Sequence, residues 1–286
     1  MKEASNNNYS FEAIDTSASG LKALSKFLSN TFKSSKFTPD YLDWIYNQNP
    51  VGGVVGFNAV FENKLAAHYA LIPLEASYKN QKLKALLSLN TATGSMHQGQ
   101  GLFTILANKT YMKCKDLGFD IVFGVANANS IHGFIKKLGW NYIDQLDTCI
   151  SLTLPKKIEI EKLKHCLTLP LSNSTTKWRL SNPNYKYYKC NFGKINIVAN
   201  DINYFARSIL KISQANSYNT KFLMPKINFW VGISNSYSWK KGFLNGFKIP
   251  EFLKPSPLHL IYKNLSSEID LNRRNIHFEA INFDAF

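Results

Sequence analysis

The 286-residue sequence lacks long apolar runs, paired cysteines and a recognisable signal sequence. No apolar run approaches the ~20 residues that cross a bilayer, and the first residues, Met1–Asn8, have no apolar core of the kind that directs secretion. No C-x-x-C pair and no histidine at zinc-finger spacing accompanies the four cysteines, Cys114, Cys149, Cys166 and Cys190. We therefore expect a cytoplasmic protein with no membrane insertion, no metal, no disulfide and buried, unreactive cysteines.

Acidic side chains are also few, since 34 Lys and Arg stand against 19 Asp and Glu and give a net charge of +15. The basic residues are spread along the chain and form no blocks. Such a charge favours a polyanionic ligand, and it suits a phosphorylated small molecule, RNA or an acidic membrane surface equally. No RNP1 or GXXG motif is present, so we expect no nucleic-acid partner. A hydrophobic fraction of 45% is enough for one large or two modest domains.

The most informative segment is a strand that passes through a glycine turn directly into an amphipathic helix. The strand covers about Ser88 to Ala92, and the helix begins near Gly101. Backbone amides in the first turn of a helix lack partners and lie at the positive end of its dipole, and glycines let backbone approach a phosphate closely. The turn is a candidate cradle for pyrophosphate, built from Met96, His97, Gln98, Gly99, Gln100, Gly101 and Leu102.

Regular elements are predicted on both sides of this turn. Before it, apolar periodicity and capping residues indicate two helices and a strand hairpin, at Ala18–Lys33, Pro39–Asn47, Gly53–Phe61 and Lys64–Ile72. After it, they indicate a buried strand and a short helix, at Phe119–Ala126 and Ile131–Leu138. Asn127–Ser130 supplies the N-cap of that helix, and Gly139 ends it.

This order of elements, with the run Asn129-Ser-Ile-His-Gly-Phe-Ile-Lys-Lys-Leu-Gly139-Trp140, resembles the core of GNAT-type N-acyltransferases over residues 10 to 150. The resemblance implies an α+β fold with a central mixed, mostly antiparallel sheet flanked by helices. It also implies acyl-CoA as co-substrate. The pantetheine arm would pair with the strand around Leu89 and Thr91, the loop Met96–Gly101 would hold the pyrophosphate, and Asn129 would contact CoA.

Two positions depart from the family pattern. Met96 stands where Gln or Arg is common, three residues before the first loop glycine. Ile135 stands where the family often has a Tyr that protonates the departing thiolate. The backbone of the loop can still bind phosphate, but the sequence offers no tyrosine acid at this place.

Attack of an amine on a thioester needs a proton acceptor and a donor for the developing oxyanion. His68 is the best-placed candidate base, because its strand should adjoin the strand before the glycine turn; the alternative is a hydrogen-bonded core histidine. Backbone amides near Asn90 are the candidate oxyanion donors. His97 is interpreted as a phosphate contact, as a catalytic residue or simply as exposed, and Asn129 as a CoA contact or a helix cap.

The second half of the chain repeats features of the first. Three segments match, namely Trp44–Pro50 with Trp178–Pro183, Val122–Ser130 with Trp230–Ser236, and Gly133–Trp140 with Lys241–Phe247. The predicted organisation is an acyl-CoA-binding unit at 1–154, a linker at 155–175 and a degenerate GNAT-like unit at 176–286. Gly193–Leu210, where the second copy should have its glycine loop before a helix, contains no Gly-x-Gly, so we expect this copy to have lost the cradle.

The degenerate unit is the candidate acceptor-binding wall. Trp178 and Tyr185 offer aromatic faces, with Tyr187, Tyr188, Trp230 and Trp239, and Arg179 offers a fork for phosphate; the alternative is that most of these are core residues. With Leu65–Pro73 and the tail Phe278–Phe286, the chain resembles sugar-nucleotide N-acyltransferases of surface-polysaccharide synthesis (O-antigen or capsule). These transfer acetyl or 3-hydroxybutyryl groups from acyl-CoA to dTDP-linked amino-6-deoxyhexoses.

The function predicted from the sequence is therefore direct acyl transfer from acyl-CoA to a nucleotide-linked aminosugar, by a monomer or a dimer. Two alternatives stay open. A tandem transferase that takes an aminoacyl group from tRNA for peptidoglycan would explain the charge and the duplication. A basic, aromatic-rich RNA-binding module would explain the charge without catalysis.

Overall fold

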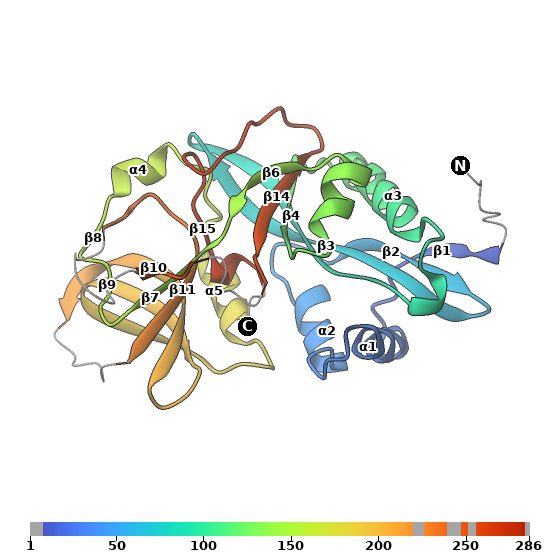
Figure 1. Cartoon of the computed structure of the whole chain (residues 1–286), viewed down its shortest axis with the longest axis horizontal. Coiled ribbons are helices and arrows are strands. Elements are labelled where there is room, and N and C mark those ends of the chain that lie inside the picture. Colours follow the sequence, from blue (N-terminus) through green and yellow to red (C-terminus); the bar gives the residue numbers. More distant parts are fainter. Residues whose placement is uncertain (1–7, 220–225, 239–246, 251–255, 284–286) are drawn as a thin grey trace.

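A computed structural model describes residues 8–219, 226–238, 247–250 and 256–283 of the chain. They form two main β-sheets side by side, the first on the right of Figure 1 and the second on the left. Three helices pack on the first sheet, α1 (Ala18–Phe32), α2 (Pro39–Tyr46) and α3 (Leu102–Asp116). Two shorter helices follow in the chain, α4 (Ile160–Lys164) and α5 (Asn173–Leu180).

The first sheet has seven strands. Their order is β1 (Ser10–Ala13), β2 (Val55–Phe61), β3 (Lys64–Tyr78), β4 (Gln81–Thr93), β5 (Ile121–Ala126), β14 (His259–Asn264) and β6 (Asn141–Gln145). Strands β4 and β5 run parallel, and the other neighbours run antiparallel. The predicted mixed, mostly antiparallel sheet flanked by helices is confirmed. Glu62 and Asn63 join β2 to β3 with positive φ angles, as a two-residue hairpin turn requires.

Helices cover both faces of the first sheet, so its interior strand β3 is buried from residue 66 to residue 74. Side chains alternate along the strand: Ile72 packs in the core with α1 and α2, whereas Leu71 packs in the core with α3. The side chains of Ser17 and Thr38 accept amide hydrogen bonds at the starts of α1 and α2. Both helices begin at the predicted residues, α2 directly after the predicted cap Thr38, and both end one residue earlier than expected.

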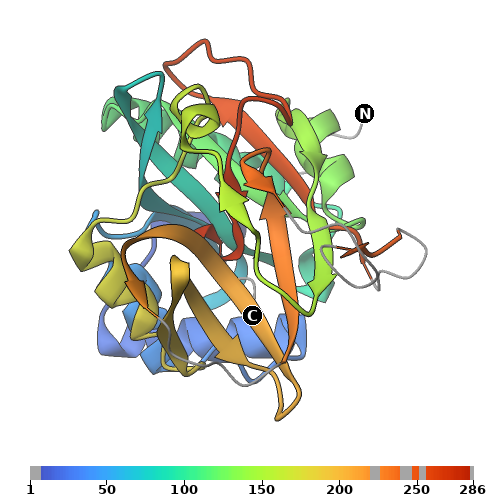
Figure 2. The ribbon, with the colours of Figure 1, turned by 90° about the vertical axis from the view of Figure 1, so that its left-hand side faces the viewer.

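The second sheet repeats the strand pattern of the first (Figure 2). Its order is β13 (Phe247–Lys248), β7 (Asp147–Ser151), β11 (Ile227–Ile233), β10 (Ala206–Asn219) and β9 (Tyr187–Asp201), with β15 (Phe278–Glu279) paired to β11. Strands β9 and β10 form an antiparallel hairpin, and β10 runs parallel to β11. The same relation joins β3, β4 and β5 in the first sheet. A small separate ladder pairs β8 (Lys157–Ile158) with β12 (Tyr237–Ser238).

The two sheets exchange one strand each. Strand β14, from the end of the chain, lies between β5 and β6 in the first sheet, where Ile261 pairs with Gly124. Strand β7, from the first half, lies between β11 and β13 in the second sheet, where Cys149 pairs with Trp230. The sequence units 1–154, 155–175 and 176–286 stay a prediction, and the sheets cross their boundaries. The predicted linker carries β8, α4 and the start of α5.

The expectation that Gly193–Leu210 holds the loop and helix of the second copy is wrong. This segment holds no loop and helix, because β9 and the start of β10 occupy it and Gly193 lies inside the hairpin. By strand order, the counterpart of the glycine turn and α3 is the connection from β10 to β11, residues 220–226, whose sequence has no glycine. Trp239 and most of the repeat match Lys241–Phe247 lie outside the described residues, as do the last three residues of the chain.

A pair of tryptophans joins the two repeats. Trp44 and Trp178 each lie six residues after the cap of their helix, Thr38 in α2 and Ser172 in α5. The indole rings stack with centroids 5.1 Å apart, and each indole N–H donates to the backbone oxygen of the other residue, at 2.7 and 2.8 Å. The two matched segments of the repeat thus contact each other through a tryptophan pair with local two-fold symmetry.

No helix in the described part of the chain is long and apolar enough to cross a membrane. All four cysteines have free thiols. Three of them are buried as expected, and burial raises the pKa of the Cys114 thiol to about 12. The expectation is wrong for Cys190, which is only half-buried on β9.

Candidate active site

Strands β4 and β5 separate in the middle of the first sheet. Their parallel pairing covers residues 85–88 of β4 and 121–124 of β5 and then stops. Just beyond, β4 has a bulge: Leu89 pairs with Ala70 and Ala92 with His68, so Asn90 and Thr91 both face the single residue between those partners. Asn90 has a φ of 55°. A bulge of this kind leaves its extra residue unpaired, and the gap beside it can accept an extended ligand as an added strand.

The glycine turn lies at the end of this gap. A short 3₁₀ turn, Ser95–His97, leads into it, and Gly99 and Gly101 have φ angles of 78° and 75°. A Cβ atom added at either glycine would meet nothing within 4 Å. Within the described residues, no amide of residues 98–103 donates to a protein acceptor. These open, unpaired amides at the start of the 15-residue helix α3 fit a pyrophosphate group.

The side chains of the predicted loop residues differ in their surroundings. Met96 is 88% exposed, and Gln98 and Gln100 are exposed as well. His97 is half-buried, because the Tyr9 hydroxyl forms a 3.0 Å hydrogen bond with its Nδ1 and the Phe61 ring packs beside it. Leu102 is buried against the sheet, so only its backbone can face a ligand.

A chain of four hydrogen-bonded side chains ends at the bulge. The Asn58 amide oxygen lies 2.7 Å from Nδ1 of His68 and accepts a hydrogen bond from its N–H group. This tautomer leaves Nε2 to accept a hydrogen bond from the Tyr46 hydroxyl at 2.9 Å. The Asn90 amide donates to the same hydroxyl at 3.0 Å. The relay runs from β2 through β3 and α2 to the bulge in β4. It holds the side chain of Asn90 in one orientation.

His68 lacks the access that a direct base needs. It is 0% exposed, burial lowers its pKa to about 3, and both ring nitrogens have partners. Burial also raises the pKa of the Tyr46 hydroxyl. The geometry gives His68 the core role considered as the alternative, with an added task, which is to fix Tyr46 and through it Asn90. Sequence reasoning missed Asn58, which stands in no motif, and Tyr46, which lies in the repeat segment Trp44–Pro50 but was given no role there.

The helix after β5 confirms the short predicted helix and shows which residue caps it. Asn127 Oδ1 accepts from the amides of Asn129 and Ser130, at 3.1 and 3.0 Å. The side chain of Asn129 is exposed and, within the described residues, has no protein partner. Capping therefore does not explain Asn129. Ile135 lies half-buried in a π-helical turn, Gly133–Lys137.

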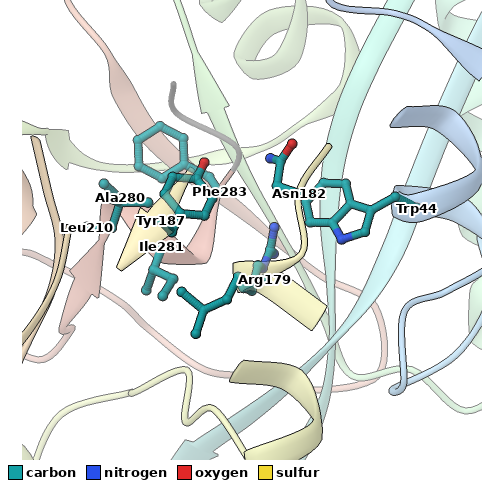
Figure 3. A pocket seen from close by; sticks show the side chains of 9 residues that line it. Trp44, Arg179, Asn182, Tyr187, Leu210, Ala280, Ile281 and Phe283 are labelled. Atoms are coloured by element: carbon teal, nitrogen blue, oxygen red, sulfur yellow. The ribbon is translucent and has the colours of Figure 1, made fainter. Parts of the chain in front are cut away.

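Of the predicted acceptor residues, Arg179 lines a small cavity together with Trp44 and Tyr187 (Figure 3). Trp178 and Arg179 are 5% and 4% exposed, and the guanidinium stacks 4.4 Å from the indole of Trp178. The cavity beside them has about 10 Å³, room for about one water. These two residues therefore have a packing role. The small cavity beside them leaves no room for an acceptor to reach them. Tyr185 is half-buried and stacks on Tyr187.

A larger hollow of about 1,040 Å³ lies at the far end of β3 and β4, lined by residues such as Leu74, Leu83 and Lys84. Lys84 is six residues from Asn90 along β4, a separation of roughly 20 Å in an extended strand. The hollow is therefore distant from the bulge. The described residues include no group of three or more His, Cys, Asp or Glu placed to hold a metal ion.

Comparisons with known proteins agree with this geometry. Residues 17–143 match the family model described as an acetyltransferase (GNAT) domain. No curated protein matches the sequence. Among solved structures, a conserved protein of Enterococcus faecalis V583, described as a probable N-acyltransferase, has a TM-score of 0.62 at 7% identity, covering 90% of this chain and 73% of that one.

Two further structures share the fold. A GCN5-related N-acetyltransferase of Anabaena variabilis has a TM-score of 0.57 at 12% identity, over 90% of this chain and 73% of that one. Eis1 of Mycobacterium abscessus has a TM-score of 0.51 at 10% identity, over 73% and 59%. At these identities the likeness concerns the fold.

The segment that matches the acetyltransferase (GNAT) domain model, residues 17–143, contains the bulge in β4 and the glycine turn before α3. The protein is therefore an acyl-transferring enzyme. GNAT domains take acetyl-CoA as co-substrate, and the open amides of the turn and the gap beside β4 fit such a molecule.

Proposed function

We propose that the protein transfers an acetyl or 3-hydroxybutyryl group from acyl-CoA to the amine of a dTDP-linked amino-6-deoxyhexose, for surface-polysaccharide synthesis. The observation that carries the proposal is the gap between β4 and β5, which begins at the bulge of Asn90 and ends at the open glycine turn. A thioester at the bulge and a pyrophosphate on the turn would lie at the two ends of one extended cofactor.

The backbone supplies the binding groups in this proposal. Amides of residues 98–103 hold the pyrophosphate, and the free side of Leu89–Thr91 pairs with the pantetheine arm. Asn129, exposed and without a capping task, reaches CoA from the other side of the gap. Acyl-CoA supplies the activated thioester, and the protein orients it.

At the bulge, the unpaired backbone amide donates to the thioester oxygen as negative charge develops there. The Asn90 amide nitrogen is committed to Tyr46, so its Oδ1 can accept from the incoming amine and orient the nitrogen lone pair. The C–N bond forms as the C–S bond breaks, the amine loses one proton, and CoA leaves as the thiol. The Asn58–His68–Tyr46 relay positions Asn90 for this step.

The acceptor class rests on the sequence resemblance and on charge. A net charge of +15 suits a substrate with a nucleoside diphosphate. We place the acceptor beside Asn90, because this side chain is half-buried whereas the relay residues behind it, Tyr46 and His68, are fully buried. Trp178 and Arg179 then act by packing, and Tyr185 stays a candidate contact.

The first experiment is a thiol-release assay with acetyl-CoA and 3-hydroxybutyryl-CoA against a panel of dTDP-3-amino and dTDP-4-amino-6-deoxyhexoses. Acceptor-dependent release is expected, and Asn90→Ala should lower kcat while changing KM for acyl-CoA little. Release with simple amines but with no sugar nucleotide would overturn the acceptor and keep the acyl transfer. No release with any pair, together with transfer from aminoacyl-tRNA, would establish the alternative donor.

A further inference from the structure

An open pocket lies between the two sheets, away from the glycine turn. It has a volume of about 400 Å³, within the range of small-molecule sites. Four segments wall it: the β3–β4 turn, residues 158–170 with α4, strand β10 after residue 210, and the segment 277–282 that contains β15. Most of its walls are apolar, from Ile160, Leu163, Leu169, Ile212 and Ile281.

One carboxylate at this cavity is already satisfied. Glu279 is 2% exposed, and its Oε1 accepts from the Ile212 amide at 3.0 Å, the Trp230 indole at 3.3 Å and the Tyr237 hydroxyl at 2.6 Å. His277 Nε2 lies 3.3 Å from its Oε2. Four donors on one carboxyl group leave little capacity for a ligand amine. Glu279 therefore does not call for a cationic guest.

One cation at the cavity is not satisfied. Lys211 lines the space from β10, directly after the bulge between Ile209 and Lys211. Within the described residues its ammonium group has no hydrogen bond and no ion pair, and burial lowers its pKa although the charge of Glu279 opposes this. A partly desolvated ammonium group beside apolar walls is stabilised by an anion that brings its own apolar body.

We propose that this cavity binds a small amphipathic carboxylate, with its head on Lys211 and its aliphatic body between α4 and residues 169 and 281. Two other lysines line the space, but Lys164 pairs with Glu161 and Lys79 lies over the Tyr78 ring. The ammonium group of Lys211 therefore matches the single charge of a carboxylate, whereas a phosphate dianion would need further donors. If each carbon or oxygen atom of the ligand takes about 30 Å³, as a water molecule does in the liquid, the volume accommodates a carboxylate with a chain of roughly eight to ten carbons. The site stands apart from the proposed acyl transfer, because none of its walls belongs to the glycine turn or to the bulge of β4.

The test uses octanoate as probe and isothermal titration calorimetry on the full chain. One molecule should bind per chain, and Lys211→Met should weaken binding about 30-fold, the equivalent of one charge-assisted hydrogen bond. Lys189→Met is the matched control, because Lys189 is an exposed lysine whose charge acts on Lys211 but which does not line the cavity. It should leave the affinity nearly unchanged.

Two further measurements separate this site from others. Leu163→Trp keeps the charge but fills the cavity, and it should abolish binding while the protein keeps its acyl-CoA affinity. Saturating CoA should leave octanoate binding unchanged. Displacement of octanoate by CoA, equal weakening by Lys189→Met and Lys211→Met, or no binding at millimolar octanoate would each overturn the proposal. None of these outcomes depends on the identity of the acyl acceptor.

Discussion

The two sheets share a strand pattern and differ in what lies between their parallel strands. In the first sheet, the gap between β4 and β5 stays open beyond the bulge. In the second sheet, β15 pairs with β11 at Gly232 and Ile233, and Glu279 reaches across to the Ile212 amide of β10. The chain itself thus fills the place that a pantetheine arm would take. This gives a physical reason to expect acyl-CoA in the first unit alone.

The polar groups beside the two bulges also differ. The first bulge is supported by neutral side chains, with His68 held uncharged by burial. The second is supported by a buried carboxylate, with Lys211 close to it in the sequence of β10. The open gap of the first sheet, with its neutral side chains, suits a substrate that binds and leaves in each catalytic cycle. The filled gap of the second sheet, with its fixed charges, suits structural stability and a ligand that stays bound.

The largest expected effect comes from breaking the contact between the repeats. Trp178→Ala should lower the free energy of unfolding by about 4 kcal/mol, because it leaves a cavity, removes the stacked ring and removes the hydrogen bond from the Trp178 indole to the Trp44 backbone oxygen. Trp178→Phe keeps a stacked ring and should cost about half as much. Urea unfolding followed by circular dichroism measures both. A loss under about 1 kcal/mol for the alanine variant would show that the repeats are coupled elsewhere.

The filled gap of the second sheet can be tested next. Glu279→Gln should destabilise the protein by about 3 kcal/mol, since it puts an amide donor among four donors. Burial, and then the charge of Glu279, raise the pKa of Tyr237, so the variant should lower that pKa toward its ordinary value. Glu268→Gln, at an exposed glutamate, is the control. Unchanged stability would mean that β15 does not hold the gap closed.

The open turn of the first unit is tested by Gly99→Ala with Gly101→Ala. The added methyl groups enter the space assigned to phosphate and strain two positive φ angles, so KM for acyl-CoA should rise about 30-fold. Gly118→Ala carries the same kind of strain, at a φ of 73°, at the end of α3 away from the turn. Thiol-release kinetics should show a normal KM for that control, and a normal KM for the double variant would contradict the cradle.

Local signals in the sequence predicted several elements of the first unit. Thr38 placed α2, the Glu62–Asn63 turn placed the β2–β3 hairpin, and the glycine turn placed α3. Each of these features depends on a few adjacent residues. The match of Trp44 with Trp178 also indicated the repeat correctly, because both residues keep the same distance from a helix cap.

Features that depend on distant residues were not predictable in this way. The exchange of β7 and β14 and the filling by β15 involve strands far apart in the sequence. The segment Gly193–Leu210 alternates like a strand, but the repeat suggested a helix and misled the prediction. His68 looked available because its burial depends on Tyr46 and Asn58, which come from two other elements.

The neutral relay predicts a dependence of stability on pH. His68 has a pKa of about 3 in the folded protein against 6.5 as the ordinary value, so between these pH values the unfolded chain binds a proton that the folded chain does not. Stability from this residue is full above pH 6.5 and should fall by about 2 kcal/mol between pH 7.5 and pH 5. His68→Gln should lack this part of the loss. His165→Gln, at an exposed histidine, should keep it; equal pH profiles for all three proteins would refute the assignment.

The smallest expected effects separate two neighbouring asparagines at the edge of the gap. Asn127→Ala removes a cap with two amide hydrogen bonds and should cost about 1 kcal/mol of stability, with KM for acyl-CoA nearly unchanged. Asn129→Ala removes an exposed side chain with no capping task, so stability should stay within about 0.5 kcal/mol while KM rises about threefold. Thermal unfolding and thiol-release kinetics on both variants distinguish a cap from a ligand contact. If Asn129→Ala left KM unchanged, the cofactor would touch only the β4 side of the gap, and the open turn and bulge would have to account for all of its binding.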